Sequence, residues 1–154
     1  MKFLEWRERI LAFNPGDPAN TKEDAVEFVS LVYQMEGRCS SEVIDVLLQT
    51  LTDKSDYGTL EAVAAVLASA DISLYVRQLV KNLDLLEADA PEWAVILFTD
   101  IIHFHSDELV EAAKSMDEKL RQRLVQYLIQ EQNEFDDYSP NAFQLVQRIV
   151  GESS

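Results

Sequence analysis

The sequence predicts an all-α fold, arranged as a short HEAT-like α-solenoid of about nine helices, with an irregular helical bundle as the alternative. Only four glycines and four prolines occur in 154 residues, which is too few for a fold built on many tight turns. Apolar residues recur at helical spacing in most segments, and chain breakers separate these segments into single-helix lengths. Helix pairs recur about every 33–36 residues, as in a helical repeat, although no residue-level repeat signature is present.

The composition predicts one domain, residues 1–154, with a core of its own, because 47% of the residues are hydrophobic. A single cysteine, Cys39, excludes an internal disulfide and is typical of a reducing compartment. The N-terminal residues carry charges instead of an apolar signal core, and no apolar run reaches membrane-spanning length. We therefore expect a cytoplasmic protein that has no membrane partner; the sequence leaves the oligomeric state open, with a monomer favoured.

The first two helices are separated by the clearest break in the chain. Residues 2–13 form an amphipathic helix, and the segment 14–20, which contains two prolines and a glycine, is expected to be an exposed loop. Thr21 caps the second helix, Asp24 completes a capping box, and Gly37 ends the helix. The residues expected on its buried side are Val26, Val29, Val32, Tyr33 and Met35.

The next three helices carry most of the regular apolar pattern. The third helix opens at Ser40 or Ser41 and ends at a polar break. The fourth has an alanine-rich middle, AVAAVLASA, which permits a close approach of another helix. The fifth starts at Asp71 or Ser73 and keeps the cleanest helical period in the chain as far as the connector LEADAP.

The most apolar run is the sixth helix, residues 91–103, which starts with proline at a favourable first position. A helix that is apolar around most of its circumference has to be covered by neighbours. The residues expected in the core are Val95, Leu97, Phe98, Ile101 and Ile102. The residues left on one polar stripe at helical spacing are Glu92, Ile96, Thr99, Asp100 and His103. We expect this stripe to serve recognition.

Three further helices complete the chain. Ser106 is expected to cap the seventh helix, and residues 117–134 form the eighth, with Arg121 and Arg123 pointing outward. The breaker NEFDDYSP precedes the last helix, and residues 151–154 are a frayed tail. The residues expected on the buried side of the last helix are Phe143, Val146, Ile149 and Val150.

No motif in the sequence indicates an enzyme, a metal site or a cofactor site. His103 and His105 are two residues apart on a helix end, so they point in different directions and lack a partner cysteine or a zinc motif. Asp100 lies three residues before His103, the spacing of an acid–base pair, but no nucleophile accompanies them. Cys39 lies outside any catalytic thiol motif.

The charge is the most informative bulk property. A net charge of −15, from 28 acidic and 13 basic residues, disfavours nucleic acid and anionic membranes and favours a basic partner. The acids concentrate in residues 84–92 and 131–138, next to aromatic residues and without a basic residue. Solvated acidic loops explain this pattern simply, and a docking surface with aromatic anchors in a charged rim explains it more specifically.

The residues that we expect to contact a partner through such a surface are Asp84, Glu87, Asp89, Glu92, Trp93, Ile96, Thr99, Asp100, His103, Glu131, Glu134, Phe135, Asp136, Asp137 and Tyr138.

A small, acidic, helical chain with a HEAT-like pattern, one cysteine and no catalytic motif resembles the immunity proteins of bacterial polymorphic-toxin and contact-dependent growth inhibition systems. The resemblance covers the whole chain in length, charge and helix pattern, and its nearest points are the stretches at Glu92-Trp93 and Glu134–Tyr138. Such proteins neutralise a toxin domain, often a basic nuclease, by binding over or beside its active site. The resemblance implies an inhibitor of a cationic toxin domain that acts by electrostatic steering and occlusion.

Two other functions remain open. A HEAT-like adaptor without an inhibitory role would bind through the stripe that contains Ile96, Thr99 and Asp100. A DNA mimic would need acids at regular spacing along an exposed face, whereas the acids here cluster in loops.

Overall fold

The computed structural model describes residues 1–54, 58–132, 134–135 and 142–151, and every regular element within these residues is a helix. The predicted all-α class is therefore confirmed. The ten helices are α1 (Phe3–Ala12), α2 (Lys22–Tyr33), α3 (Ser41–Gln49), α4 (Thr59–Leu67), α5 (Ile72–Lys81), α6 (Leu83–Asp89), α7 (Pro91–Phe104), α8 (Ser106–Ser115), α9 (Glu118–Gln130) and α11 (Ala142–Gly151).

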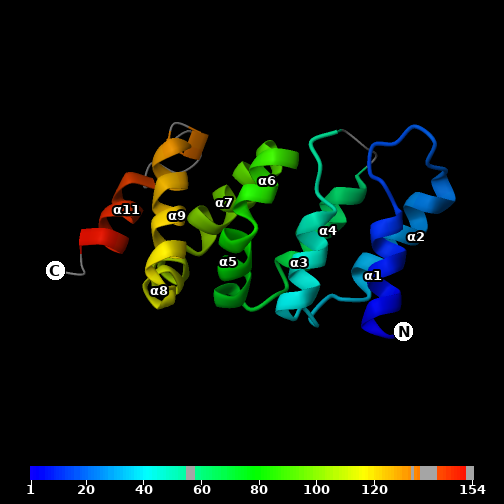
Figure 1. Cartoon of the computed structure of the whole chain (residues 1–154), viewed down its shortest axis with the longest axis horizontal. Coiled ribbons are helices and arrows are strands. Elements are labelled where there is room, and N and C mark those ends of the chain that lie inside the picture. Colours follow the sequence, from blue (N-terminus) through cyan, green and yellow to red (C-terminus); the bar gives the residue numbers. More distant parts are fainter. Residues whose placement is uncertain (55–57, 133, 136–141, 152–154) are drawn as a thin grey trace.

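The helices follow one another along the long axis of the molecule in sequence order, from α1 and α2 at one end to α11 at the other (Figure 1). Helix α1 packs on α2 and α3, α3 packs on α5, and α5 packs on α8 and α9. Solenoids and elongated bundles share such sequential stacking. A regular HEAT-like pair repeat is not confirmed, and the arrangement is consistent with the alternative, an irregular helical bundle.

One connected hydrophobic core extends from Trp6 in α1 to Ile149 in α11. Its largest fully buried side chains are Trp6, Tyr127, Phe28, Phe98 and Phe135. In α7 the expected core residues Leu97, Phe98, Ile101 and Ile102 are buried, and Val95 is half-buried. None of the described helices combines the length and the apolar character that a membrane crossing requires.

The predicted buried faces of α2 and of the last helix are partly wrong. Val26 and Tyr33 are 61% and 45% exposed, because α2 packs through Phe28, which stacks on Phe13 at a ring-centroid distance of 4.6 Å. In α11 the buried stripe consists of Ala142, Leu145 and Ile149. Phe143 and Val150 fall outside this stripe and are 54% and 53% exposed. In both helices the apolar pattern was wide enough to allow more than one rotation about the axis.

The fifth predicted helix is two helices, because the chain bends at Asn82 between α5 and α6. The Asn82 side-chain amide donates to the backbone oxygen of Gln78 at 2.8 Å and to Asp45 Oδ1 at 2.9 Å. Gln78 Nε2 donates to the same Asp45 oxygen at 2.7 Å. Side-chain hydrogen bonds of asparagine compete with the helical ladder, so Asn82 is a favourable place for the bend. Only Ala90 remains of the connector expected before Pro91.

The helix caps show where α3 and α5 begin, which the sequence left open. The capping box of Thr21 and Asp24 is present, with bonds of 3.1 and 2.9 Å. Ser40 caps α3 and Asp71 caps α5. The predicted cap at Ser106 is wrong, because Ser106 is already the first residue of α8 and His105 precedes it without a side-chain bond.

Two loop predictions need correction. The segment 14–20 is non-helical as expected, but Pro15 is buried, so the loop is not wholly exposed. Helix α2 ends at Tyr33, earlier than predicted, and Gly37 has φ +74° in the following turn, where glycine is favoured. Of the expected frayed tail, Gly151 belongs to α11, and residues 152–154 lie outside the described residues.

The first helix is joined to the second by a buried hydrogen bond. Trp6 is fully buried, and its Nε1 donates to the backbone oxygen of Leu31 at 2.8 Å. The N–H of Met35, which would be the helical partner of that oxygen, bonds to Val32 instead. Trp6 therefore satisfies a free carbonyl at the C-terminal end of α2.

We predict that Trp6→Phe lowers the free energy of unfolding by about 2–3 kcal/mol, because it removes buried volume and leaves the Leu31 oxygen without a donor. Urea denaturation followed by circular dichroism measures the change. Leu4→Ala on the same helix is the control, since Leu4 is 69% exposed and should change the stability by less than about 0.5 kcal/mol. Similar losses for the two variants would contradict the prediction.

Candidate functional site

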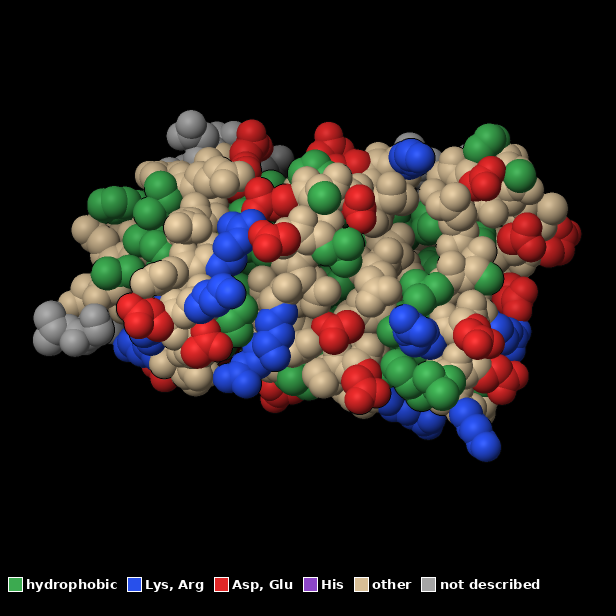
Figure 2. All heavy atoms as spheres, in the orientation of Figure 1, with side chains coloured by type: hydrophobic (Ala, Val, Ile, Leu, Met, Phe, Trp, Pro, Cys, Tyr) green, Lys and Arg blue, Asp and Glu red, His purple; other side chains and the backbone are tan. Residues whose placement is uncertain are grey.

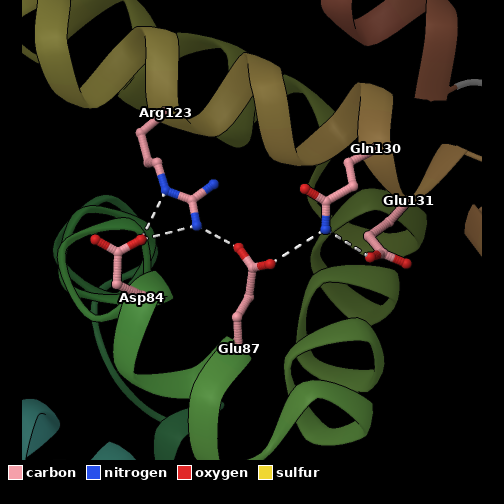
Figure 3. A network of polar contacts seen from close by, with 5 residues as sticks. All are labelled: Asp84, Glu87, Arg123, Gln130 and Glu131. Carbon is pink, nitrogen blue, oxygen red and sulfur yellow. Dashed lines mark hydrogen bonds and ion pairs between the residues drawn. The ribbon is translucent and has the colours of Figure 1, made fainter.

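The acidic residues of α6 are held by an arginine from α9. Arg123 lies between the carboxylates of Asp84 and Glu87, with Nε 3.0 Å from Asp84 Oδ1 and Nη2 bonded to Glu87 (Figure 3). Gln130 Nε2 then donates to Glu87 at 3.1 Å and to Glu131 at 3.1 Å. These contacts fasten α6 to α9, and we call these five residues the Arg123 network.

The network has electrostatic consequences for its members. Burial alone would lower the pKa of Arg123, but the hydrogen bonds and charges of Glu87 and Asp84 outweigh burial and raise the pKa. The pKa of Tyr127 is raised, first by burial and then by the charges of Glu131 and Glu87. The Tyr127 hydroxyl is buried without a hydrogen-bond partner. Arg123 therefore stays cationic and Tyr127 stays neutral across the physiological range.

The predicted docking surface at residues 84–92 is thus only partly available. Arg123 was expected to point outward, but it neutralises part of the charge of Asp84 and Glu87. Asp89 and Glu92 are exposed, and neither carboxylate has an ion pair in the part of the chain that the structure describes. The pairing was not visible in the sequence, because Arg123 lies 36 and 39 residues away from its partners.

The second acidic stretch, residues 131–138, also differs from the predicted docking surface. Phe135 is fully buried against Tyr127, with ring centroids 5.8 Å apart, so it is a core residue and not an anchor for a partner. Glu134 is exposed, and Glu131 accepts the bond from Gln130. The other predicted members, Asp136, Asp137 and Tyr138, lie outside the described residues.

We predict that Arg123→Gln lowers the free energy of unfolding by about 1–2 kcal/mol, because it leaves two carboxylates close together without a cation. The loss should be smaller than for a fully buried pair, since the Asp84 side chain is 90% exposed. Urea denaturation at low salt measures it, and about 1 M NaCl should reduce the loss by screening the repulsion.

Arg121→Gln is the matched control for this variant. Arg121 lies on the same helix and has no ion pair among the described residues, so its loss should stay within about 0.5 kcal/mol. Equal losses in the two variants would show that only the net charge matters.

The predicted stripe of α7 is largely exposed. Glu92, Asp100 and His103 are exposed, Ile96 is 47% exposed, and Trp93 beside them is half-buried. Thr99 is the exception, because its hydroxyl is buried without a hydrogen-bond partner and is not presented on the surface. The exposure of the other residues agrees with the predicted geometry, while their role in recognition stays a prediction.

Two hollows lie between α4 and α7, and we call this region the α4–α7 surface. The first hollow, of about 230 Å³, contains Trp93, Ile96, Glu61 and Glu92, and we call it the Trp93 hollow. The second, of about 290 Å³, is lined by alanines of α4 and by Tyr75, Asp100 and Phe104, and we call it the Tyr75 hollow. Each hollow combines apolar and acidic side chains, with Lys54 also at the Trp93 hollow and His105 also at the Tyr75 hollow.

The charges of the α4–α7 surface are free to meet a partner. Glu61, Glu92 and Asp100 have no ion pair within the described residues. The only Lys or Arg that lines either hollow is Lys54, at the Trp93 hollow. On the face of the molecule shown in Figure 2, acidic side chains are spread along the length, several basic ones form a column left of the centre and others lie toward the right-hand end, and no histidine is visible.

Asp53 positions the start of α7 beside the Trp93 hollow. Its two carboxylate oxygens accept from the backbone N–H of Glu92 at 2.8 Å and of Trp93 at 3.2 Å. The residue before α7, Ala90, offers no side-chain cap, and Pro91 has no N–H. Asp53 therefore caps α7 from 39 and 40 residues away, which no local sequence signal could have shown.

We predict that Asp53→Ala lowers the free energy of unfolding by about 1–2 kcal/mol, because it removes the side chain that caps α7 among the described residues and a charge that favours the N-terminus of α7. Denaturation monitored by tryptophan fluorescence measures the loss, since Trp93 lies at the capped end. Asp53→Asn keeps a capping oxygen and should recover about half of it. An Asp53→Ala variant as stable as the unchanged protein would show that water replaces the cap.

The sequence predicts neither a metal site nor a reactive thiol at His103, His105 and Cys39, and the surroundings of these residues are as follows. No group of three or more His, Cys, Asp or Glu side chains there is placed to hold a metal ion. His103 packs edge-on against Phe104 at 4.5 Å, and His105 Nδ1 lies 3.9 Å from Glu108. Burial raises the pKa of the half-buried Cys39 thiol, and a hydrogen bond with Ser69 opposes this only in part. Cys39 is therefore protonated at neutral pH.

No protein-family model matches the chain, and searches of the curated proteins and of the solved structures give no match either.

Proposed function

We propose that this protein is an immunity-type inhibitor that binds and neutralises a cationic bacterial toxin domain, such as a nuclease, on the α4–α7 surface. The observation that carries the proposal is the combination of free carboxylates and apolar hollows in one place, with Glu61, Glu92 and Asp100 around Trp93 and Ile96. Tight interfaces commonly have an aromatic or aliphatic centre inside a charged rim.

The mechanism that we propose has two stages. The net charge of −15 attracts a basic domain over a distance and raises the rate of encounter. The apolar floor then determines how long the complex lasts, because most differences in affinity between related complexes arise from dissociation. A toxin domain held in this way loses access to its substrate through occlusion. The proposal places the protein in the cytoplasm, where such a domain acts.

The α4–α7 surface differs from the surface inferred from sequence alone. Asp84 and Glu87 form part of the Arg123 network, so reversing their charge would also loosen α6 from α9. Glu61, Glu92 and Asp100 form no comparable contact within the described residues, which makes them cleaner positions for a test of steering.

The first experiment uses the gene encoded directly upstream, which should specify a large secreted protein with a variable C-terminal domain. Expression of that C-terminal domain alone should arrest bacterial growth, and co-expression of this protein should restore it. Arrest without rescue, or a neighbouring domain that shows no binding to the purified protein at low salt, would contradict the proposal.

We predict that the triple variant Glu61→Lys, Glu92→Lys and Asp100→Lys slows association with the toxin domain by about tenfold at low ionic strength and weakens its salt dependence. Surface plasmon resonance at several salt concentrations measures both effects. The control variant Glu8→Lys, Glu42→Lys and Glu118→Lys has the same net charge, but its positions lie on α1, α3 and α9. Equal effects of the two variants would refute this docking surface.

The same experiment separates the inhibitor from a HEAT-like adaptor. An adaptor would bind its partner without restoring growth, and Ile96→Ala would weaken binding more than the charge reversals. An inhibitor requires rescue and a dominant effect of the charge reversals on the association rate.

A further inference from the structure

The Tyr75 hollow has the features of a built site for one side chain of a partner. Its volume is about 290 Å³, and its walls come from α4, α5 and α7 together with the turn that precedes α5. Ala64 and Ala68 supply only methyl groups on the α4 side, and Ile72, Leu97 and Ile101 supply aliphatic surface. The depth of the hollow is therefore a consequence of small residues on α4.

Among the described residues, the polar side chains that line this hollow are Tyr75, Asp100 and His105, and His105 Nδ1 lies 3.9 Å from Glu108 Oε2. Tyr75 is only 6% exposed, and its hydroxyl makes no hydrogen bond within the described part of the chain. Burial, and then the negative charge of Asp100, raise the pKa of Tyr75, so the phenol stays protonated and neutral. Asp100 is close enough to exert this effect, yet it forms no ion pair among these residues. The Tyr75 hydroxyl and the exposed Asp100 carboxylate are therefore both available to a partner that enters the hollow.

We propose that the Tyr75 hollow receives the side chain of a lysine from the partner, with its ammonium group between the Asp100 carboxylate and the Tyr75 phenol oxygen and its methylene groups against the aliphatic walls. The identity of the partner rests on the proposed function, but the site itself can be tested without that partner.

The chemistry of the hollow favours a lysine over other occupants. An anion would meet Asp100, and within the described part of the chain no Lys or Arg lines the hollow, while the imidazole of His105 lies beside Glu108. An ammonium group has three donors, which one carboxylate and one phenol oxygen can largely satisfy. A guanidinium group has five donors, so more of them would be buried without acceptors. The aliphatic walls suit the four-carbon stem of lysine, which is commonly buried beneath its charged end.

The test is a titration of the ¹⁵N-labelled protein at about pH 7 with Nα-acetyl-lysine N-methylamide, followed by NMR. At this pH the ammonium group of the probe is charged. The expected dissociation constant is on the order of millimolar, since one side chain supplies only a small part of an interface. The amide signals of Ala64, Ala68, Tyr75 and Asp100 should shift together.

Two further probes test whether binding needs the ammonium charge and whether a guanidinium group can replace it. Nα-acetyl-norleucine N-methylamide has an apolar side chain without the ammonium group and should bind at least about tenfold more weakly. Nα-acetyl-arginine N-methylamide should also bind more weakly than the lysine probe. Equal binding of the norleucine probe would overturn the role of Asp100, and tighter binding of the arginine probe would overturn the assignment to lysine.

Three variants locate the site, and each keeps the helix intact. Asp100→Asn removes the charge, Tyr75→Phe removes the phenol oxygen, and Ala68→Leu fills the hollow from α4. Each should weaken binding of the lysine probe by about fivefold or more, whereas the control Glu42→Gln on α3 should not change it. Amide spectra of the free variants report whether the fold is retained. Unchanged binding in all three folded variants would overturn the site.

The outcomes for the hollow and for the proposed function can be told apart. If the lysine probe binds as described but no toxin domain is neutralised, the site stands and the proposed function falls. If neutralisation depends on Glu61 and Glu92 but not on Asp100→Asn or Ala68→Leu, the proposed function stands and the lysine site falls.

Discussion

The structure depends on covering α7, a helix that is apolar around most of its circumference and therefore needs neighbours on several sides. Helices α6 and α8 contact it, and Phe98 reaches Tyr127 of α9 at a ring-centroid distance of 4.8 Å. One side of α7 stays uncovered, and this side carries Glu92, Ile96, Asp100 and His103. The covered sides join the middle and the C-terminal helices into one core, and the uncovered side carries the α4–α7 surface.

The sequence predicted what depends on neighbours within one or two helical turns. The capping box at Thr21 and the division of α7 into a core and a stripe are local properties, and both are present. Contacts across about 40 residues were not predictable, because nothing near Asp53 indicates that it caps α7, and nothing near Arg123 indicates a partner. The prediction that Phe135 contacts a partner was wrong because an aromatic residue among acids has the same sequence pattern whether it faces the core or a partner.

Charge repulsion within the molecule is a cost of the acidic composition. A net charge of −15 opposes compaction, and the Arg ion pairs that offset it among the described residues are Arg9–Glu27 at one end, Arg123 with Asp84 and Glu87 in the middle, and Arg148–Asp107 near the other end. The pairs of Arg123 and Arg148 join helices 36 to 41 residues apart in sequence, and Arg9–Glu27 joins the consecutive helices α1 and α2. The carboxylates around the α4–α7 surface lack such ion pairs, so a basic partner would relieve repulsion that the free protein bears.

The hydrogen bonds of Asp45 to Gln78 and Asn82 have a consequence for this surface. Apolar faces tolerate small sliding and rotation, but a directional contact between α3 and α5 allows only one register. Gln78 is 5% exposed, so water competes poorly for its amide. Helix α5 also supplies Tyr75 to the Tyr75 hollow, so this contact holds that wall in register with α3. A ligand would therefore meet a preorganised surface, and little of its binding free energy would be lost to ordering the protein.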